Sequence, residues 1–75
     1  MASINFPLSA DYIELNQLLK LVGVCDSGGA GKALVAEGLV QVDGQPESRK
    51  TAKIRVGQRV RCGDFRIQVV ADKAG

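Results

Sequence analysis

The basic side chains of this sequence are concentrated in residues 47–66, where their chemistry is the binding of anions. This segment has seven basic residues against Glu47 and Asp64, a balance of +5, while the whole chain has a formal charge of +2. The rest of the chain is therefore net acidic. Such an asymmetry predicts a basic face that binds a polyanion, although a solvated sheet surface that maintains solubility can have the same composition. The basic residues are Arg49, Lys50, Lys53, Arg55, Arg59, Arg61 and Arg66.

A glycine-rich stretch, residues 27–32, is a second candidate anion site. It is not a nucleotide P-loop, because Asp26 stands where the first glycine is required and Ala33 follows Lys32. A dinucleotide GxGxxG motif is excluded as well, because Leu34 stands at its last glycine position. The stretch still predicts a helix N-terminus whose backbone N–H groups, together with Lys32, bind one phosphate. A tight turn that lets two helices cross closely is an alternative, and the two are compatible.

The residues that carry catalysis or hold metals are missing or scattered. The chain has no histidine, and no two carboxylates have a spacing that suggests acid–base work. Cys25 and Cys62 form no metal-binding motif, so we expect no enzyme, no metal and no cofactor. We expect both cysteines to be free thiols in a reducing compartment, with a single disulfide as the alternative. The absence of a signal segment and of a long apolar run predicts a cytoplasmic protein without membrane association.

Two short helices are expected to position the glycine-rich stretch. Residues 1–10 have no hydrophobic period, so we expect a flexible N-terminal arm there. Apolar residues at helical spacing predict a first helix that ends at Gly23 and leaves Lys20 on its polar side. Ser27 has the character of an N-cap for a second helix that ends before Gly38. The apolar positions are Leu15, Leu18, Leu19 and Val22 in the first helix, and Ala30, Ala33, Leu34 and Val35 in the second.

Gly31 lies inside the second predicted helix, where glycine is unfavourable. Glycine in a helix interior costs about 1 kcal/mol relative to alanine. Gly31 therefore indicates either close packing of the two helices or the close approach of a ligand.

Residues 39–70 have the patterns of strands. Asp43-Gly44 and Gly63-Asp64 are typical of hairpin turns. A two-residue loop at Gly63-Asp64 places Arg61 opposite Arg66, and like charges directly opposite destabilise a sheet. Either both side chains extend into water, or an anion lies across them. The fold class is therefore α+β, two short helices packed on a small, mostly antiparallel sheet, with one domain over residues 11–71 and a polar tail over 72–75. The expected core face of the last hairpin is Val60, Cys62, Phe65 and Ile67.

The order of these motifs resembles the S-four RNA-binding domain, in its short stand-alone bacterial branch. In that family two helices and an adjoining strand turn form the αL motif, which docks on structured RNA. The resemblance runs from about residue 13 to residue 70. It rests on Ile13-Glu14-Leu15-Asn16-Gln17-Leu18-Leu19-Lys20, Ser27-Gly28-Gly29-x-x-Lys32, Glu37-Gly38-x-Val40-x-Val42-Asp43-Gly44, Glu47-Ser48-Arg49-Lys50-x-x-Lys53 and Val56-Gly57-Gln58.

The resemblance implies non-catalytic binding of structured RNA, either ribosomal or transfer RNA, by a monomer. A protein-interaction adaptor in a ribosome-associated or RNA-processing assembly is the alternative. The chain departs from the family in having Gly28 where many members have arginine, Gly31 where this branch more often has alanine, Asp43 in place of asparagine and Gln58 in place of aspartate. The implied RNA-facing residues are Lys20, Ser27, Gly28, Gly29, Lys32, Arg49, Lys50 and Lys53.

Overall fold

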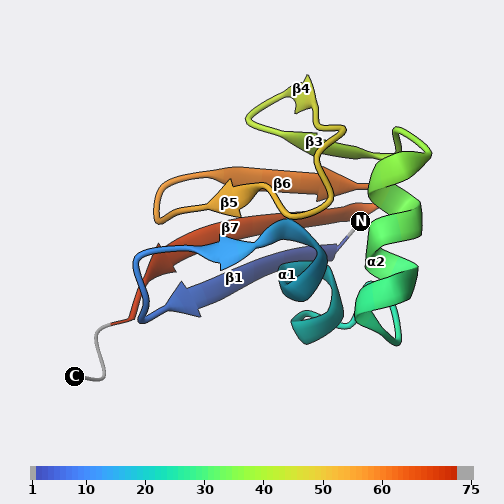
Figure 1. Ribbon diagram of the computed structural model, residues 1–75. Coiled ribbons are helices and arrows are strands. Elements are labelled where there is room, and N and C mark those ends of the chain that lie inside the picture. The colour runs from blue at the N-terminus through green and yellow to red at the C-terminus, as the bar shows by residue number, and fades with distance from the viewer. Residues whose placement is uncertain (1, 73–75) are drawn as a thin grey trace.

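The computed structural model describes residues 2–72, so the predicted polar tail lies outside the described residues except for Asp72. Two helices, α1 (Leu15–Leu21) and α2 (Gly28–Ala36), combine with short strands (Figure 1). No helix in this part of the chain is long and apolar enough to cross a membrane. The strands are β1 (Ala2–Leu8), β2 (Ile13–Glu14), β3 (Val40–Val42), β4 (Gln45–Pro46), β5 (Lys53–Ile54), β6 (Arg59–Cys62) and β7 (Phe65–Ala71).

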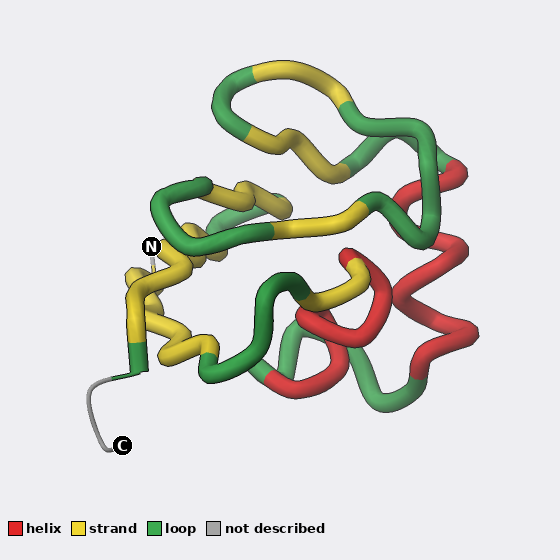
Figure 2. The backbone as a smooth tube through the Cα atoms, turned by 60° about the vertical axis from the view of Figure 1, so that its left-hand side comes forward, coloured by secondary structure: helices red, strands yellow, loops and turns green. Residues whose placement is uncertain are grey.

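The main sheet has five strands in the order β1-β7-β6-β3-β4. Only β1 and β7 pair in parallel, and the other neighbours are antiparallel. Strands β2 and β5 form a separate antiparallel pair. The helices gather on one side of the strands (Figure 2). The predicted α+β class, with two helices on a small and mostly antiparallel sheet, is confirmed.

The N-terminal segment is a strand, and the predicted flexible arm over residues 1–10 was wrong. Residues 2–8 pair along their whole length with β7, from Ala2 opposite Phe65 to Leu8 opposite Ala71. Ile4, Phe6 and Leu8 alternate with exposed residues and pack on the core, which is the period of a half-buried strand. The sequence gives no sign of the partner strand, because that strand lies at the other end of the chain.

Both outer strands of the main sheet contain a proline. Pro7 lies in β1 and Pro46 in β4, and these strands are the two edges. Proline lacks a backbone N–H, so it is tolerated at an edge and it limits pairing with another chain. The same residue that obscures β1 in the sequence therefore suits its place in the sheet.

The two predicted hairpin turns are confirmed. Gly63-Asp64 joins β6 to β7 and sets Arg61 opposite Arg66, Val60 opposite Ile67 and Cys62 opposite Phe65. Asp43 and Gly44 both have a positive φ, of 53° and 81°, at the turn between β3 and β4. This left-handed pair is the geometry that the Asp-Gly dipeptide favours in hairpins.

The helix ends also lie where the sequence predicts them. Ser27 is the N-cap of α2, and its Oγ accepts a hydrogen bond of 3.1 Å from the Ala30 backbone N–H. Gly23 and Gly38 follow the C-caps of α1 and α2 with φ of 84° and 75°, which suits glycine. Both helices are thus ended by local signals.

The buried face of α2 differs from the prediction. Gly31 and Val35 are its buried residues, Leu34 is half-buried, and Ala30 and Ala33 are exposed. The buried positions are four residues apart, one above the other on the helix face. The prediction was right for Leu34 and Val35, but it was wrong for Ala30 and Ala33 and gave no inward position to Gly31.

Close packing of the two helices accounts for Gly31. A Cβ built at this position would lie 2.9 Å from the Asn16 backbone oxygen and 3.3 Å from the Asn16 Cα. Backbone atoms cannot move aside as a flexible side chain can. Of the two explanations that the sequence left open, the structure therefore supports helix packing.

We expect Gly31→Ala to destabilise the protein although alanine is the better helix former. The overlap with α1 costs about 1–3 kcal/mol, against a gain of about 1 kcal/mol from helix propensity, so a urea titration should show a net loss of up to about 2 kcal/mol. Gly29→Ala is the matched control, because the nearest atom to its added Cβ would be Ser27 Oγ at 3.9 Å. A Gly31→Ala variant more stable than the Gly29→Ala variant would contradict close crossing.

The core lies between the helices and the inner face of the sheet. It is aliphatic, with Leu15, Leu18, Val35 and Ile67 among its fully buried side chains. Cys62 belongs to this core, where burial raises the pKa of its thiol and nearby Cys25 raises it further. The prediction that both cysteines are free thiols agrees with the structure, in which Cys25 donates a hydrogen bond to the Ser27 carbonyl.

Candidate nucleic-acid interface

The loop that carries Arg49 and Lys50 is held against the start of α1. Glu14, the N-cap of this helix, makes no side-chain cap. Instead, the backbone N–H of Leu15 donates to the Ala52 carbonyl at 2.9 Å, and that of Asn16 donates to the Lys50 carbonyl at 3.1 Å. Because the backbone of the loop satisfies donors at the helix start, its basic side chains are left at the surface in a defined place.

Basic residues from two distant segments meet in one open hollow beside α2. Lys32 of α2 lines it together with Arg49, Lys50 and Lys53. None of the lining residues is acidic, so the like charges add to a positive potential. We call this feature the basic hollow; its lining residues are Lys32, Ser48, Arg49, Lys50, Thr51, Ala52 and Lys53.

Arg49, the arginine of the basic hollow, is paired with an acidic residue, Glu47. Arg49 Nε donates to Glu47 Oε1 at 3.0 Å and forms an ion pair with it. The exposed fraction of the Arg49 side chain is 80%. The Glu47 side chain is only 19% exposed, so its carboxylate offsets part of the positive charge at the edge of the hollow and competes with a phosphate for the Arg49 guanidinium.

An aromatic ring that the sequence reasoning missed supports Lys53. Lys53 Nζ lies 5.0 Å from the centre of the Tyr12 ring, and the Arg55 guanidinium lies 6.0 Å from it. Both distances are in the range of a cation–π interaction. The pairing of β2 with β5 brings Tyr12 close to Lys53 and Arg55. No pattern in the sequence predicts that pairing.

Asn16 connects the basic hollow to the glycine-rich start of α2. Its backbone N–H binds the Lys50 carbonyl, and its side-chain Nδ2 would lie 3.6 Å from a Cβ at Gly28. Asn16 is only 3% exposed, and its Oδ1 has no hydrogen-bond partner among the described residues. The start of α2 therefore adjoins the loop that carries Arg49 and Lys50.

The structure thus gathers half of the predicted RNA-facing residues into one surface. Lys32, Arg49, Lys50 and Lys53 line the basic hollow. The predicted positions Ser27, Gly28 and Gly29 lie at the start of α2 and are not among its lining residues. Lys20 is exposed near the end of α1 and is not in the hollow either.

Two of the departures from the family pattern turn out to contact each other. Asp43 Oδ1 accepts from the Arg59 backbone N–H at 2.9 Å, and Asp43 Oδ2 accepts from Gln58 Nε2 at 3.3 Å. Gln58 Oε1 in turn accepts from the Arg55 backbone N–H at 2.8 Å. Asp43 and Gln58 therefore hold two turns together, and the carboxylate lies outside the basic hollow.

The chemistry available at this surface is electrostatic. Within residues 2–72, no three His, Cys, Asp or Glu side chains are grouped to hold a metal ion. Lysine and arginine side chains are suited to phosphate, arginine through a planar fork and lysine through a mobile ammonium. The arrangement is therefore one that binds an anion.

Comparisons with known proteins agree on one family. Residues 6–70 match the S4 domain. The protein YbcJ of Escherichia coli is 48% identical over 60 residues, which are 80% of this chain and 86% of YbcJ. RlbA of Bacillus subtilis, named a probable ribosome maturation protein, is 39% identical over 61 residues, 79% of this chain and 86% of RlbA.

A solved structure supports the same assignment. The solution structure of E. coli YbcJ is described as revealing an αL motif involved in RNA binding. It matches this fold with a TM-score of 0.68 and 44% sequence identity, over 95% of this chain and 89% of the YbcJ chain. The overall fold of this chain thus has a counterpart in a relative of known structure. The chain belongs to the S4 domain family, the S-four domain that its sequence resembles, and contains the αL motif.

Proposed function

We propose that this protein binds structured RNA without catalysing a reaction, and that the basic hollow contacts the RNA phosphates. The observation that carries the proposal is the meeting of Lys32 with Arg49, Lys50 and Lys53 in a hollow without an acidic lining residue. These four exposed cations come from two segments of the chain, and together they create a positive potential that favours a bound anion. Phosphate contacts of this kind fix a protein on RNA without reading its sequence.

The shape of the RNA is the property that this surface is suited to read. The exposed aromatic side chain near the hollow, Tyr12, has Lys53 Nζ at 5.0 Å and the Arg55 guanidinium at 6.0 Å from its ring centre, and these cations compete with a base for the ring. Proteins that lack stacking aromatics recognise RNA helices by their form and by contacts to phosphates and 2′-hydroxyls. The glycine-rich start of α2, with Ser27, Gly28 and Gly29, adds backbone N–H donors beside the hollow.

Ribosomal RNA is the first RNA to test, with transfer RNA as the second. RlbA, which is 39% identical to this chain, is named a probable ribosome maturation protein, and the αL motif of YbcJ is described as involved in RNA binding. An adaptor that binds ribosomal or RNA-processing proteins is the rival. The exposed apolar residues Leu21 and Leu39 would serve such a role.

The salt dependence of binding tests the proposal. If Lys32, Arg49, Lys50 and Lys53 each touch a phosphate, log affinity should fall against log salt with a slope of roughly −3, at about 0.7 to 0.9 per contact. Fluorescence anisotropy with a labelled ribosomal RNA hairpin, repeated from low to moderate salt, measures this slope. If the protein binds neither this hairpin nor transfer RNA at low salt, the proposal is wrong and the protein-interaction adaptor is favoured.

A further inference from the structure

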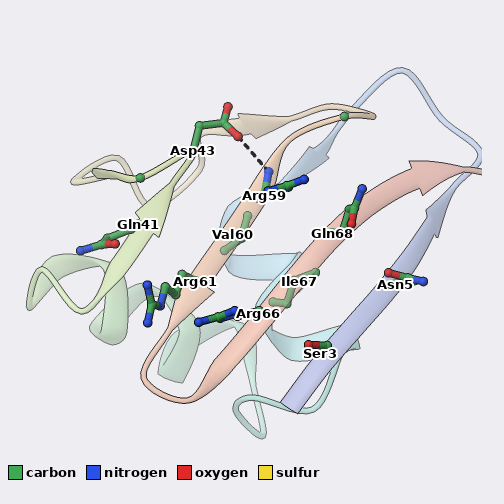
Figure 3. Close-up of a pocket in the computed structure, with 12 residues that line it drawn as sticks. Ser3, Asn5, Gln41, Asp43, Arg59, Val60, Arg61, Arg66, Ile67 and Gln68 are labelled. Carbon is green, nitrogen blue, oxygen red and sulfur yellow. Dashed lines mark hydrogen bonds between the residues drawn. The ribbon is translucent and has the colours of Figure 1, made fainter. Parts of the chain in front are cut away.

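A second group of arginines lies on the outer face of the main sheet, away from the helices. Along β6 and β7, the buried side chains of Val60 and Ile67 face the core, so the alternate residues face outward. These outward residues are exposed and include three arginines (Figure 3). None of them lines the basic hollow. The three arginines are Arg59, Arg61 and Arg66.

The outward residues form two rows, one that crosses four strands and one that crosses three. In the first row, Gln41 of β3 is opposite Arg61, Arg61 is opposite Arg66, and Arg66 is opposite Ser3 of β1. The second row sets Arg59 opposite Gln68 and Gln68 opposite Asn5. We call the surface made by these two rows the arginine face. Its residues line one open hollow in the surface (Figure 3).

The arginines of this face have no acidic partner among the described residues. The ion pair described above joins Arg49 to Glu47 and involves none of these three arginines. One acidic residue, Asp43, also lines this hollow, and its carboxylate accepts hydrogen bonds from the Arg59 backbone N–H and from Gln58 Nε2. Arg61 and Arg66 lie directly opposite each other, which destabilises a sheet when both side chains are charged.

The chemistry of the face points to one occupant. Guanidinium groups bind phosphate oxygens in a bidentate way. The neighbouring amides and hydroxyl of Gln41, Gln68, Asn5 and Ser3 are neutral groups that hydrogen-bond phosphate oxygens and 2′-hydroxyls. None of the residues that line this hollow is aromatic, so a base has no ring there on which to stack. The face is therefore suited to the sugar–phosphate backbone of RNA.

We propose that the arginine face binds a second stretch of RNA backbone, so that the protein bridges two RNA segments, one at each surface. This inference rests on the proposed function of the basic hollow. It also gives a reason for the opposed arginines, because a phosphate between Arg61 and Arg66 turns their repulsion into shared attraction. An acidic protein surface is the competing occupant, and the experiment separates the two.

The double variant Arg61→Gln/Arg66→Gln tests the inference with an RNA junction of two helices as the probe. The slope of log affinity against log salt should flatten by about 1.5, at 0.7 to 0.9 per lost contact, and affinity at moderate salt should fall about tenfold. The urea midpoint of the free protein should be equal or higher, because a like-charge pair has been removed. A loss of binding without a loss of stability is the signature that a structural role would not produce.

Two comparisons keep the result unambiguous. Ser9→Glu/Ala10→Glu lowers the net charge by the same two units at exposed positions that line neither surface, and it should flatten the slope by less than half as much. If the wild-type protein binds the junction and the Arg61→Gln/Arg66→Gln variant binds it equally well, the inference is overturned, while the basic hollow still stands. If the charge control weakens binding as much as the arginine variant does, the face has no specific role and the inference is also overturned.

Discussion

The variant Arg49→Ala/Lys50→Ala should bind a structured RNA roughly ten- to hundredfold more weakly than the wild-type protein, if each lost phosphate contact contributes about 1 kcal/mol or slightly more. Both residues line the basic hollow, and both side chains are exposed. The slope of log affinity against log salt should flatten by about one to two units, and the loss should be similar for RNAs of different sequence. Fluorescence anisotropy over a salt series measures both quantities.

The fold should survive this change, since exposed charges contribute little to stability. The loop is held by the backbone carbonyl of Lys50, which alanine retains. Circular dichroism and a urea titration check this point. An unchanged affinity in the double variant, with measurable binding by the wild-type protein, would place the RNA elsewhere than in the basic hollow.

Glu47→Gln is a control with the opposite sign. It removes the carboxylate that accepts from Arg49 Nε and it removes one negative charge beside the basic hollow. Affinity for RNA should therefore rise by roughly two- to fivefold, the factor that corresponds to about 0.4–1 kcal/mol for an ion pair at the protein surface. If Glu47→Gln raises affinity while Arg49→Ala/Lys50→Ala lowers it, damage to the fold cannot explain both results.

Leu8→Ala should lower the free energy of unfolding by about 2–3 kcal/mol, the cost of a cavity at a well-packed position. Leu8 is 7% exposed and belongs to the core, although it lies in the segment that the sequence reasoning treated as an arm. Such a loss is a large fraction of the stability of a domain of this size, roughly 4–11 kcal/mol. A urea titration followed by circular dichroism measures it.

Asn5→Ala is the matched control in the same strand. Asn5 is exposed and lies on the outer face of the sheet, so its replacement should change stability by no more than about 0.5 kcal/mol.

Removal of residues 1–8 should have a larger effect than Leu8→Ala and leave the chain unfolded at 25 °C, because the side chains of Ile4 and Phe6 are lost from the core as well. A truncated protein that unfolds at the same urea concentration as the full chain would show that β1 contributes nothing.

The parts of the fold that depend on neighbouring residues could be predicted from the sequence. Ser27 caps its helix through Ala30, three residues away. The Gly63-Asp64 turn sets the register of Arg61 and Arg66 within a few residues of itself. In each case the signal and its structural effect lie within one turn, so the sequence alone contains both.

The parts that depend on distant residues could not be predicted in the same way. β1 has a strand pattern, but its partner is the last described strand and its Pro7 makes the segment look irregular. The Tyr12 ring gains its role only because β2 pairs with β5. Likewise, Lys32 and Arg49 were placed in one site by the family resemblance, since nothing in their spacing implies that the loop docks at the start of α1.

The pairing of β1 with β7 has a consequence for how the chain matures during synthesis. β1 is made early, but its partner β7 is translated last among the described strands. Until then, the apolar side chains of Ile4, Phe6 and Leu8 have no sheet to cover them. The α1–α2 pair can form sooner, because the two helices follow each other in the sequence. The apolar side chains of β1 therefore stay exposed until β7 is available, and this edge of the sheet cannot close before then.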